Sequence, residues 1–343
     1  MRHLAVLIPG YMGFAGSGPR FDYWGAVSAE LLKRGIEPVS VPTHPAASIE
    51  RRAERLRRNI VRMFPQERAL PRSLHLIGHS MGGLDARWLA SPAVSVHLPA
   101  PLQERLRTVI CIAAPHFGTP LADFGRAVRF DKFMAFCSRS ALKLAEPNAV
   151  EQAWRFFETR KYALERSLNG APRDILRVFE DLAEDPQGRL PAVAQYLRSL
   201  SKLSGALEDM SSERMRRLSA RMSDAPNARY ISYAAGVRAP RRASLYAFMD
   251  YYASRWPKGG APRSAVLDGC IWPKEGRVEV DARLTDGVAP TLSQLWGETR
   301  GFAAVDHYAV IGRPDIIDPP SRFRREGFEA LCGSLAEDIL STC

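Results

Sequence analysis

Residues 74–83 read LHLIGHSMGG, and this stretch decides the fold. The apolar run Leu74–Ile77 predicts a buried strand, and residues 84–90 after the motif predict a helix. Between them, Gly78-His79-Ser80-Met81-Gly82 matches G-x-S-x-G, a pattern that occurs by chance in many proteins and takes its meaning from the strand and helix beside it. In such a turn the serine holds strained backbone angles, and side chains at the glycine positions would collide with the flanking elements. The motif predicts a serine hydroxyl presented above a helix N-terminus.

Strands and helices alternate around this turn. Leu4–Ile8 is an apolar run stopped by Pro9-Gly10, and Phe21–Arg34 carries apolar residues at helical spacing. Because such alternation produces a parallel sheet covered on both faces, we expect an α/β fold with a mostly parallel central sheet flanked by helices. The other expected elements are strands at Val39–Val41, Thr108–Ile112, Asn227–Ala234 and Phe302–Val305, a helix with Ala53, Leu56, Ile60 and Phe64 on one face, an irregular span over 241–283, and a closing helix over Arg322–Leu340.

A helical segment interrupts the alternation. From about Leu121 to Pro226 the sequence is mostly helical in pattern, charged and poor in strands. We therefore expect a helical cap, or lid, inserted over residues 121–227 into a core made of residues 1–120 and 228–343. Near its start, apolar residues recur at close to helical spacing, which favours packing against the sheet over a lid face that meets lipid: Phe124, Phe130, Phe133, Met134 and Phe136.

A serine of this kind needs a base, and behind this motif the acid and the histidine follow in the order Ser, Asp, His. Three histidines follow Ser80. His97 comes too soon to leave a strand that could supply the acid, and His116 directly follows the strand that ends at Ile112. A lone histidine is more often structural than catalytic, but elimination and chain order make His307 the candidate base.

The candidate acid is Asp286. The segment TDGVAP at residues 285–290 forms a turn in which a short carboxylate can point inward and orient an imidazole. Asp306 adjoins the histidine and is expected to face away from its Nδ1. The aspartates upstream of His307 that could serve are Asp250, Asp268, Asp281, Asp286 and Asp306.

Two backbone amides are candidates for an oxyanion hole. One is the N–H of Met81, which follows the serine at the helix N-terminus. The other is the N–H of Tyr11, in the loop Pro9-Gly10-Tyr11-Met12-Gly13 after the first strand. The alternative for that loop is a plain glycine turn.

Several stretches resemble the bacterial true lipases, the family of the Pseudomonas, Burkholderia and thermophilic Bacillus triacylglycerol lipases. IPGY at 8–11 resembles the oxyanion loop of that family, and LIGHSMGG at 76–83 its nucleophile region. AAPHFGTP at 113–120, DGVAP at 286–290 and VDHY at 305–308 are similar to the later blocks. The resemblance covers roughly residues 1–120 and 228–343. It implies an α/β-hydrolase fold with Ser80, Asp286 and His307 as catalytic triad.

The sequence departs from that family at two positions. Pro9 stands where a histidine usually precedes the glycine, and Ala309 stands where a calcium-binding carboxylate is common. We therefore expect no calcium site. The five cysteines form no C-x-x-C pair, so no thiolate metal site is expected and no cofactor is implied.

Composition narrows the class of protein. The 343 residues are 46% hydrophobic and 25% charged, and no run approaches the about 18 apolar residues of a membrane-spanning helix. The first residues suit a core strand better than a signal peptide, so a cytoplasmic location is expected. The net charge of +11 permits transient contact with an anionic lipid surface, although a solvated helix face is the simpler reading. No motif supports nucleic-acid binding.

The resemblance and the order of the motifs together predict a serine carboxylic ester hydrolase, a lipase or esterase, acting on acylglycerols or other lipid-like esters. One alternative keeps the same residues in a soluble esterase, thioesterase or polyester depolymerase. A second, of another class, is a non-catalytic lipid-binding or scaffolding protein. The expected partner is a small-molecule or lipid ester substrate.

Overall fold

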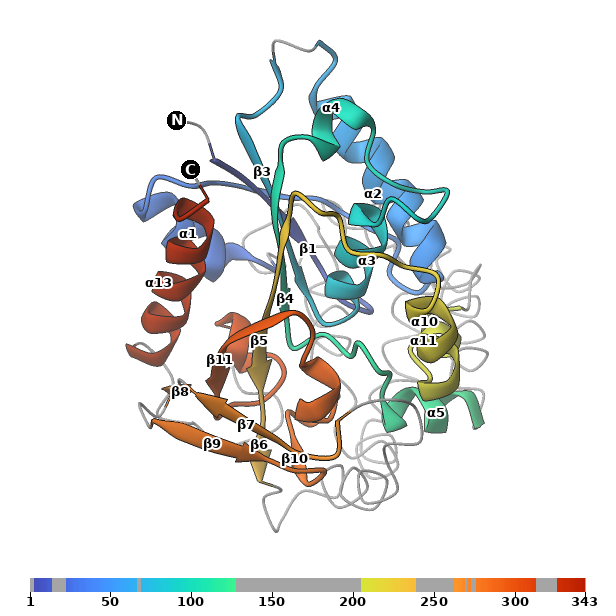
Figure 1. Ribbon diagram of the computed structural model, residues 1–343, viewed down its shortest axis with the longest axis vertical. Coiled ribbons are helices and arrows are strands. Elements are labelled where there is room, and N and C mark those ends of the chain that lie inside the picture. The colour runs from blue at the N-terminus through green and yellow to red at the C-terminus, as the bar shows by residue number, and fades with distance from the viewer. Residues whose placement is uncertain are drawn as a thin grey trace, which may run out of the picture.

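A seven-stranded sheet forms the centre of the computed structural model (Figure 1), which describes residues 3–13, 23–66, 69–127, 205–238, 262–268, 270–272, 276–312 and 326–342. The strand order is β2-β1-β3-β4-β5-β11-β8, and every neighbouring pair is parallel. The strands are β1 (His3–Ile8), β2 (Glu37–Ser40), β3 (Ser73–His79), β4 (Leu106–Ile112), β5 (Arg229–Ala235), β8 (Cys270–Trp272) and β11 (Glu298–Ala303).

Helices cover both faces of the sheet (Figure 1). Successive side chains of a strand point to opposite faces, and β1 follows this rule. Leu4 and Val6 pack in one core with α2 and α3, whereas Ala5 and Leu7 pack in a second core with α1 and α13. The helices are α1 (Gly25–Lys33), α2 (Ile49–Met63), α3 (Met81–Ala90), α4 (Ala100–Gln103) and α13 (Glu326–Leu340).

The span 241–283 is more regular than expected. Its described part holds β7 (Ala265–Asp268) and β9 (Arg277–Val280), an antiparallel pair, and β8, which joins the central sheet at its edge. These strands are only three or four residues long and carry mixed apolar, aromatic and charged residues, so the sequence shows no clear alternation there. The expectation of irregular structure was wrong there.

The helices and strands of the N-terminal half lie close to their expected positions. The helix expected at 84–90 begins earlier, at Met81. The last expected strand, Phe302–Val305, is β11 and begins at Glu298. The closing helix begins at Glu326, and the expected residues 322–325 lie outside the described part.

Only the two ends of the predicted cap are described, since residues 128–204 are not among the residues that the structure describes. These ends are helical: α5 (Pro120–Ala127), α10 (Ala206–Asp209) and α11 (Ser212–Ser219). Ala122, Leu207 and Met215 belong to the same core as α2 and α3. The described part therefore packs against the sheet domain, while Phe130, Phe133, Met134 and Phe136 are not described. Within the described residues, no helix has the length and apolar character to cross a membrane.

Because the strands are parallel, the loops that follow them begin at the same edge of the sheet, that of the carboxyl ends. The loops after β1, β3, β4 and β11 leave from their carboxyl ends. In sheets of this type, ligands bind at that edge. The loops after β1, β3 and β11 carry the candidates Tyr11, Ser80 and His307.

Candidate active site

Ser80 occupies the turn between β3 and α3 in a strained conformation. Its φ is 56° and its ψ is −130°, and only 5% of the residue is exposed. Its N–H donates to the Ile112 carbonyl at 2.9 Å, and its carbonyl accepts from the Gly83 N–H at 3.0 Å, which holds the turn against β4 and α3. Such strain persists where the surrounding structure fixes it, and it is concentrated at functional sites.

The same edge of the sheet collects the other strained residues. Among the described residues, three that are not glycine have a positive φ: Met12 after β1, Ser80 after β3 and Ala113 after β4. Their φ values are 57°, 56° and 51°. Backbone strain thus marks three neighbouring loops at one end of the molecule, independently of the sequence motif.

The two motif glycines are required by space. A Cβ at Gly78 would lie 2.2 Å from the Gly82 carbonyl oxygen, and one at Gly82 would lie 2.2 Å from the Ile8 carbonyl oxygen. Both contacts are with backbone, which cannot move aside. A Cβ at Gly10 would lie 2.8 Å from the Ser80 Cβ, so the loop after β1 lies directly against the serine.

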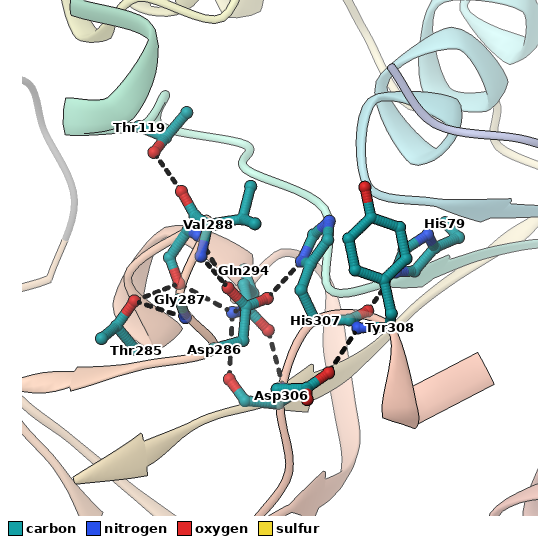
Figure 2. A network of polar contacts seen from close by, with 12 residues as sticks. His79, Thr119, Thr285, Asp286, Gly287, Val288, Gln294, Asp306, His307 and Tyr308 are labelled. Atoms are coloured by element: carbon teal, nitrogen blue, oxygen red, sulfur yellow. Dashed lines mark hydrogen bonds and ion pairs between the residues drawn. The ribbon is translucent and has the colours of Figure 1, made fainter. Parts of the chain in front are cut away.

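His307 and Asp286 form a buried hydrogen bond (Figure 2). The distance from His307 Nδ1 to Asp286 Oδ2 is 2.6 Å, and the two residues are 2% and 0% exposed. The His307 N–H also donates to the Asp286 carbonyl at 2.9 Å. Because a carboxylate accepts the Nδ1 proton, the neutral ring carries its lone pair on Nε2.

The Asp286 carboxylate is held from several sides (Figure 2). Its Oδ1 accepts the N–H groups of Val288 and Ala289 at 2.8 and 2.7 Å. Its Oδ2 accepts from the Gln294 amide at 3.1 Å as well as from His307. Gln294 is itself fixed, since its Oε1 accepts the Ala235 N–H at 2.7 Å. No sequence pattern marks Gln294, which lies in the 3₁₀ helix η2 (Thr291–Gln294).

The other candidate acids have different tasks or positions. Asp306 Oδ1 accepts the N–H groups of Tyr308 and Ala309 at 2.8 Å each, in a turn at the start of the 3₁₀ helix η3 (Ala309–Ile311). Asp281 Oδ1 accepts the Arg283 N–H in a turn. Asp250 lies outside the described residues.

The two histidines set aside by elimination lie elsewhere. His97 Nδ1 donates to the Val94 carbonyl at 2.7 Å, in the loop after α3. His116 is fully buried, with its ring centroid 5.9 Å from that of Trp296. Burial lowers the pKa of His116 far below its usual value, so its ring is neutral.

His79 joins the loops that carry the candidate residues. Its Nε2 donates to the His307 carbonyl at 2.8 Å, and its ring centroid lies 4.6 Å from that of His307. Since Nε2 carries the proton, Nδ1 accepts the Tyr23 hydroxyl hydrogen at 2.5 Å. The Tyr23 oxygen accepts the Gly10 N–H at 3.2 Å. One polar chain therefore runs from the loop after β1, past the residue before Ser80, to His307.

Known proteins identify this architecture. Lipase 1 from Pelosinus fermentans superposes with a TM-score of 0.53 at 18% identity, covering 98% of this chain and 98% of that one. The chain has the α/β-hydrolase fold. A metagenomic carboxyl esterase superposes with a TM-score of 0.53 at 16% identity, covering 99% of this chain and 76% of that one. EstA from Clostridium botulinum superposes with a TM-score of 0.52 at 15% identity, covering 98% of this chain and 88% of that one.

Sequence comparison adds a narrower finding. Residues 48–150 match the family described as the PGAP1-like alpha/beta domain. No curated protein matches the chain in sequence. The expected resemblance to α/β hydrolases and the expected mostly parallel sheet flanked by helices are therefore confirmed, and at these identities the structural likeness establishes the fold alone.

Met81 follows Ser80 directly, and Tyr11 follows Gly10, the glycine that lies against the Ser80 Cβ. Met81 is the first residue of α3, where an N–H has no partner within the helix. The carbonyl of Gly10 accepts the Gly13 N–H at 3.1 Å. In a planar trans peptide the N–H points opposite to the carbonyl, so the Tyr11 N–H points away from that turn.

The described part of the chain has no cluster of metal-ligating side chains. No group of three or more His, Cys, Asp or Glu side chains is placed to hold an ion among the residues described. Ala309, which stands where the resemblance would put a calcium ligand, is buried in η3.

Proposed function

We propose that the protein hydrolyses carboxylic esters, with Ser80 as nucleophile, His307 as base and Asp286 as the orienting acid. The observation that carries this proposal is the buried 2.6 Å hydrogen bond between His307 Nδ1 and Asp286 Oδ2, beside a strained elbow serine. It supports the order Ser, Asp, His that this fold uses.

In the proposed reaction, His307 Nε2 takes the proton of the Ser80 hydroxyl as Oγ attacks the ester carbonyl carbon. The carbonyl oxygen becomes negative and accepts the N–H groups of Tyr11 and Met81. The imidazolium, stabilised by the Asp286 carboxylate, then protonates the leaving alcohol oxygen as the ester C–O bond breaks. Water, deprotonated by the same base, releases the acid from the acyl-enzyme.

Burial favours this chemistry. Ser80 and His307 are 5% and 2% exposed, so the reacting groups lie away from bulk water. In such surroundings, oriented N–H dipoles stabilise a developing charge more strongly than they do in water. Gln294 and the turn at Val288 and Ala289 keep the acid's carboxylate in place without motion during the reaction.

The proposed substrates are acylglycerols or other lipid-like esters. Two of the structural neighbours are described as a lipase and a carboxyl esterase, which favours esters over amides. A soluble esterase, thioesterase or polyester depolymerase would use the same three residues. A non-catalytic lipid-binding protein would keep the fold without the chemistry.

One experiment separates these functions. Hydrolysis of p-nitrophenyl esters from acetyl to palmitoyl is measured for the wild type, for Ser80→Ala and for Ser95→Ala, a control at an exposed serine after α3. We expect activity in the wild type and the control, and none in Ser80→Ala. A fluorophosphonate should label the wild type at Ser80. Failure of both labelling and hydrolysis would favour the non-catalytic protein.

Chain-length preference and droplets separate lipase from soluble esterase. A lipase should prefer long acyl chains, and its rate should rise when the substrate passes from monomers to droplets. A flat response across that transition would favour the soluble esterase and would remove the lid role proposed for residues 121–227.

A further inference from the structure

Arg52 is a buried cation in α2 with an unusual set of partners. Its side chain is 0% exposed, as is that of Asp85, and their closest approach is 2.7 Å from Nη2 to Oδ2. Nε also donates to Asp85 Oδ2 at 2.8 Å. Asp85 lies in α3, the helix that begins directly after Ser80. The ion pair thus ties α2 to the nucleophile helix.

The rest of the guanidinium holds backbone carbonyls. Nη2 donates to the Pro9 carbonyl at 2.7 Å and lies 3.4 Å from the Gly10 carbonyl oxygen. Nη1 donates to the His44 carbonyl. A planar guanidinium can address a carboxylate and these carbonyls together, whereas an ammonium group at this position has one donor centre.

These bonds orient the peptide planes of the loop after β1. The Pro9 carbonyl points to Arg52, so the N–H of the same planar peptide, that of Gly10, points the opposite way. The 3.2 Å bond from Gly10 N–H to the Tyr23 hydroxyl agrees with this direction. The Gly10 carbonyl also faces Arg52, which turns the Tyr11 N–H to the far side.

The same loop packs against the serine. Gly10 packs so closely on Ser80 that an added Cβ would lie 2.8 Å from the Ser80 Cβ. Arg52 therefore acts on the loop from behind, while Asp85 anchors Arg52 to the helix whose first N–H is the other proposed oxyanion donor. The Arg52 side chain therefore contacts both elements that carry the proposed donors, the loop after β1 and α3.

We propose that Arg52 is a positioning residue for the oxyanion hole, fixing the Tyr11 amide relative to the Met81 amide through its bonds to Pro9, Gly10 and Asp85. This inference rests on the proposed ester hydrolysis. It predicts that losing Arg52 weakens stabilisation of the transition state more than it weakens binding of the ester.

The test separates this role from stability. Replacing both charges, as in Arg52→Met with Asp85→Leu, leaves no buried charge unpaired, so the variant is expected to fold, with a Tm lowered by the loss of the donors to the Pro9 and His44 carbonyls. Its kcat should nevertheless fall about 100-fold with KM nearly unchanged, because loss of one oxyanion donor costs about 10²-fold or more. Arg52→Lys keeps the cation and should lose kcat as well.

A matched control is Arg58→Met, which changes an exposed arginine of the same helix paired with Glu54 and should leave kcat unchanged. Wild-type kcat in the double variant, or in Arg52→Lys should the double variant fail to fold, would overturn the inference. A wild type that neither hydrolyses esters nor reacts with fluorophosphonate would instead defeat the proposed function, whatever the variants do.

Discussion

Replacing Asp286 with asparagine tests the proposed acid most sharply, because the structure dictates how the amide must lie. The site of Oδ1 faces two backbone N–H groups, from Val288 and Ala289, and only an oxygen can accept both. The amide oxygen therefore takes that site and the NH₂ group takes the site of Oδ2. There it meets His307 Nδ1 and the NH₂ group of Gln294, both of them donors in the wild type.

This exchange forces the wrong tautomer on His307. With an N–H donor opposite Nδ1, the ring keeps its proton on Nε2 and has no lone pair for the Ser80 hydroxyl. Loss of the acid in triads of this kind lowers kcat about 10⁴-fold while leaving the geometry intact, and we expect a similar loss here. Gln294 cannot relieve the conflict by turning its amide, since its Oε1 accepts the Ala235 N–H and its Nε2 donates to the Ala235 carbonyl.

The assay is steady-state hydrolysis of a p-nitrophenyl ester, with the tautomer of His307 read from ¹⁵N chemical shifts. Asp306→Asn is the matched control, because Asp306 is a buried aspartate next to the histidine and its Oδ1 accepts two N–H groups at the start of η3. We expect the control to keep its kcat and nearly all of its stability, because an asparagine oxygen accepts the same two N–H groups. A kcat for Asp286→Asn within about tenfold of the wild type would refute the assignment of the acid.

Three further outcomes follow from particular contacts. Gly82→Ala should prevent folding, measured as loss of soluble protein, because its Cβ would lie 2.2 Å from the Ile8 carbonyl oxygen. The control Gly333→Ala, whose Cβ would meet nothing within 4 Å, should be neutral or stabilising. A soluble and active Gly82→Ala variant would contradict the steric argument. Tyr23→Phe removes the hydroxyl between Gly10 and His79 and should cost about 2 kcal/mol in urea unfolding, and an unchanged midpoint would argue against the polar chain. Burial lowers the pKa of His75 from 6.5 to about 3, so its contribution to stability is present above pH 6.5 and is lost as the pH falls toward 3. By pH 5 the loss is ~2 kcal/mol, and His75→Gln should flatten the pH dependence of the unfolding free energy by that amount. A pH dependence equal to that of the wild type would count against this prediction.

The core of the fold could be predicted because its elements carry strong local signals. The apolar runs of β1, β3 and β4 end in glycine or proline, and short-range pattern is enough to place such strands. The start of α3 was placed late, since Gly82 and Gly83 have low helix propensity and only the tertiary turn makes them helical. β11 was expected too late because it begins with Glu298, Thr299 and Arg300, whose polar side chains hid its first half.

The residues that support the site were beyond the reach of sequence pattern. Gln294, Tyr23 and Arg52 act through contacts with residues distant in the chain, such as Arg52 with Pro9 or Tyr23 with His79. No fixed spacing links such partners, because the sheet alone brings their loops together. A buried arginine on an otherwise basic helix is also indistinguishable, in sequence, from its exposed neighbours.

The three proposed catalytic residues are held in different ways, and this divides their structural roles. Ser80 is fixed by its own main chain, through bonds to Ile112 and Gly83, and His307 is fixed through its N–H to Asp286 and its carbonyl to His79. Replacing either side chain leaves those bonds in place. The Asp286 side chain, in contrast, accepts two backbone N–H groups of its own turn. Removing that carboxylate therefore releases the turn as well as the imidazole, so the acid contributes to the stability of the loop on which it lies, whereas the nucleophile and the base contribute chemistry to a scaffold that stands without them.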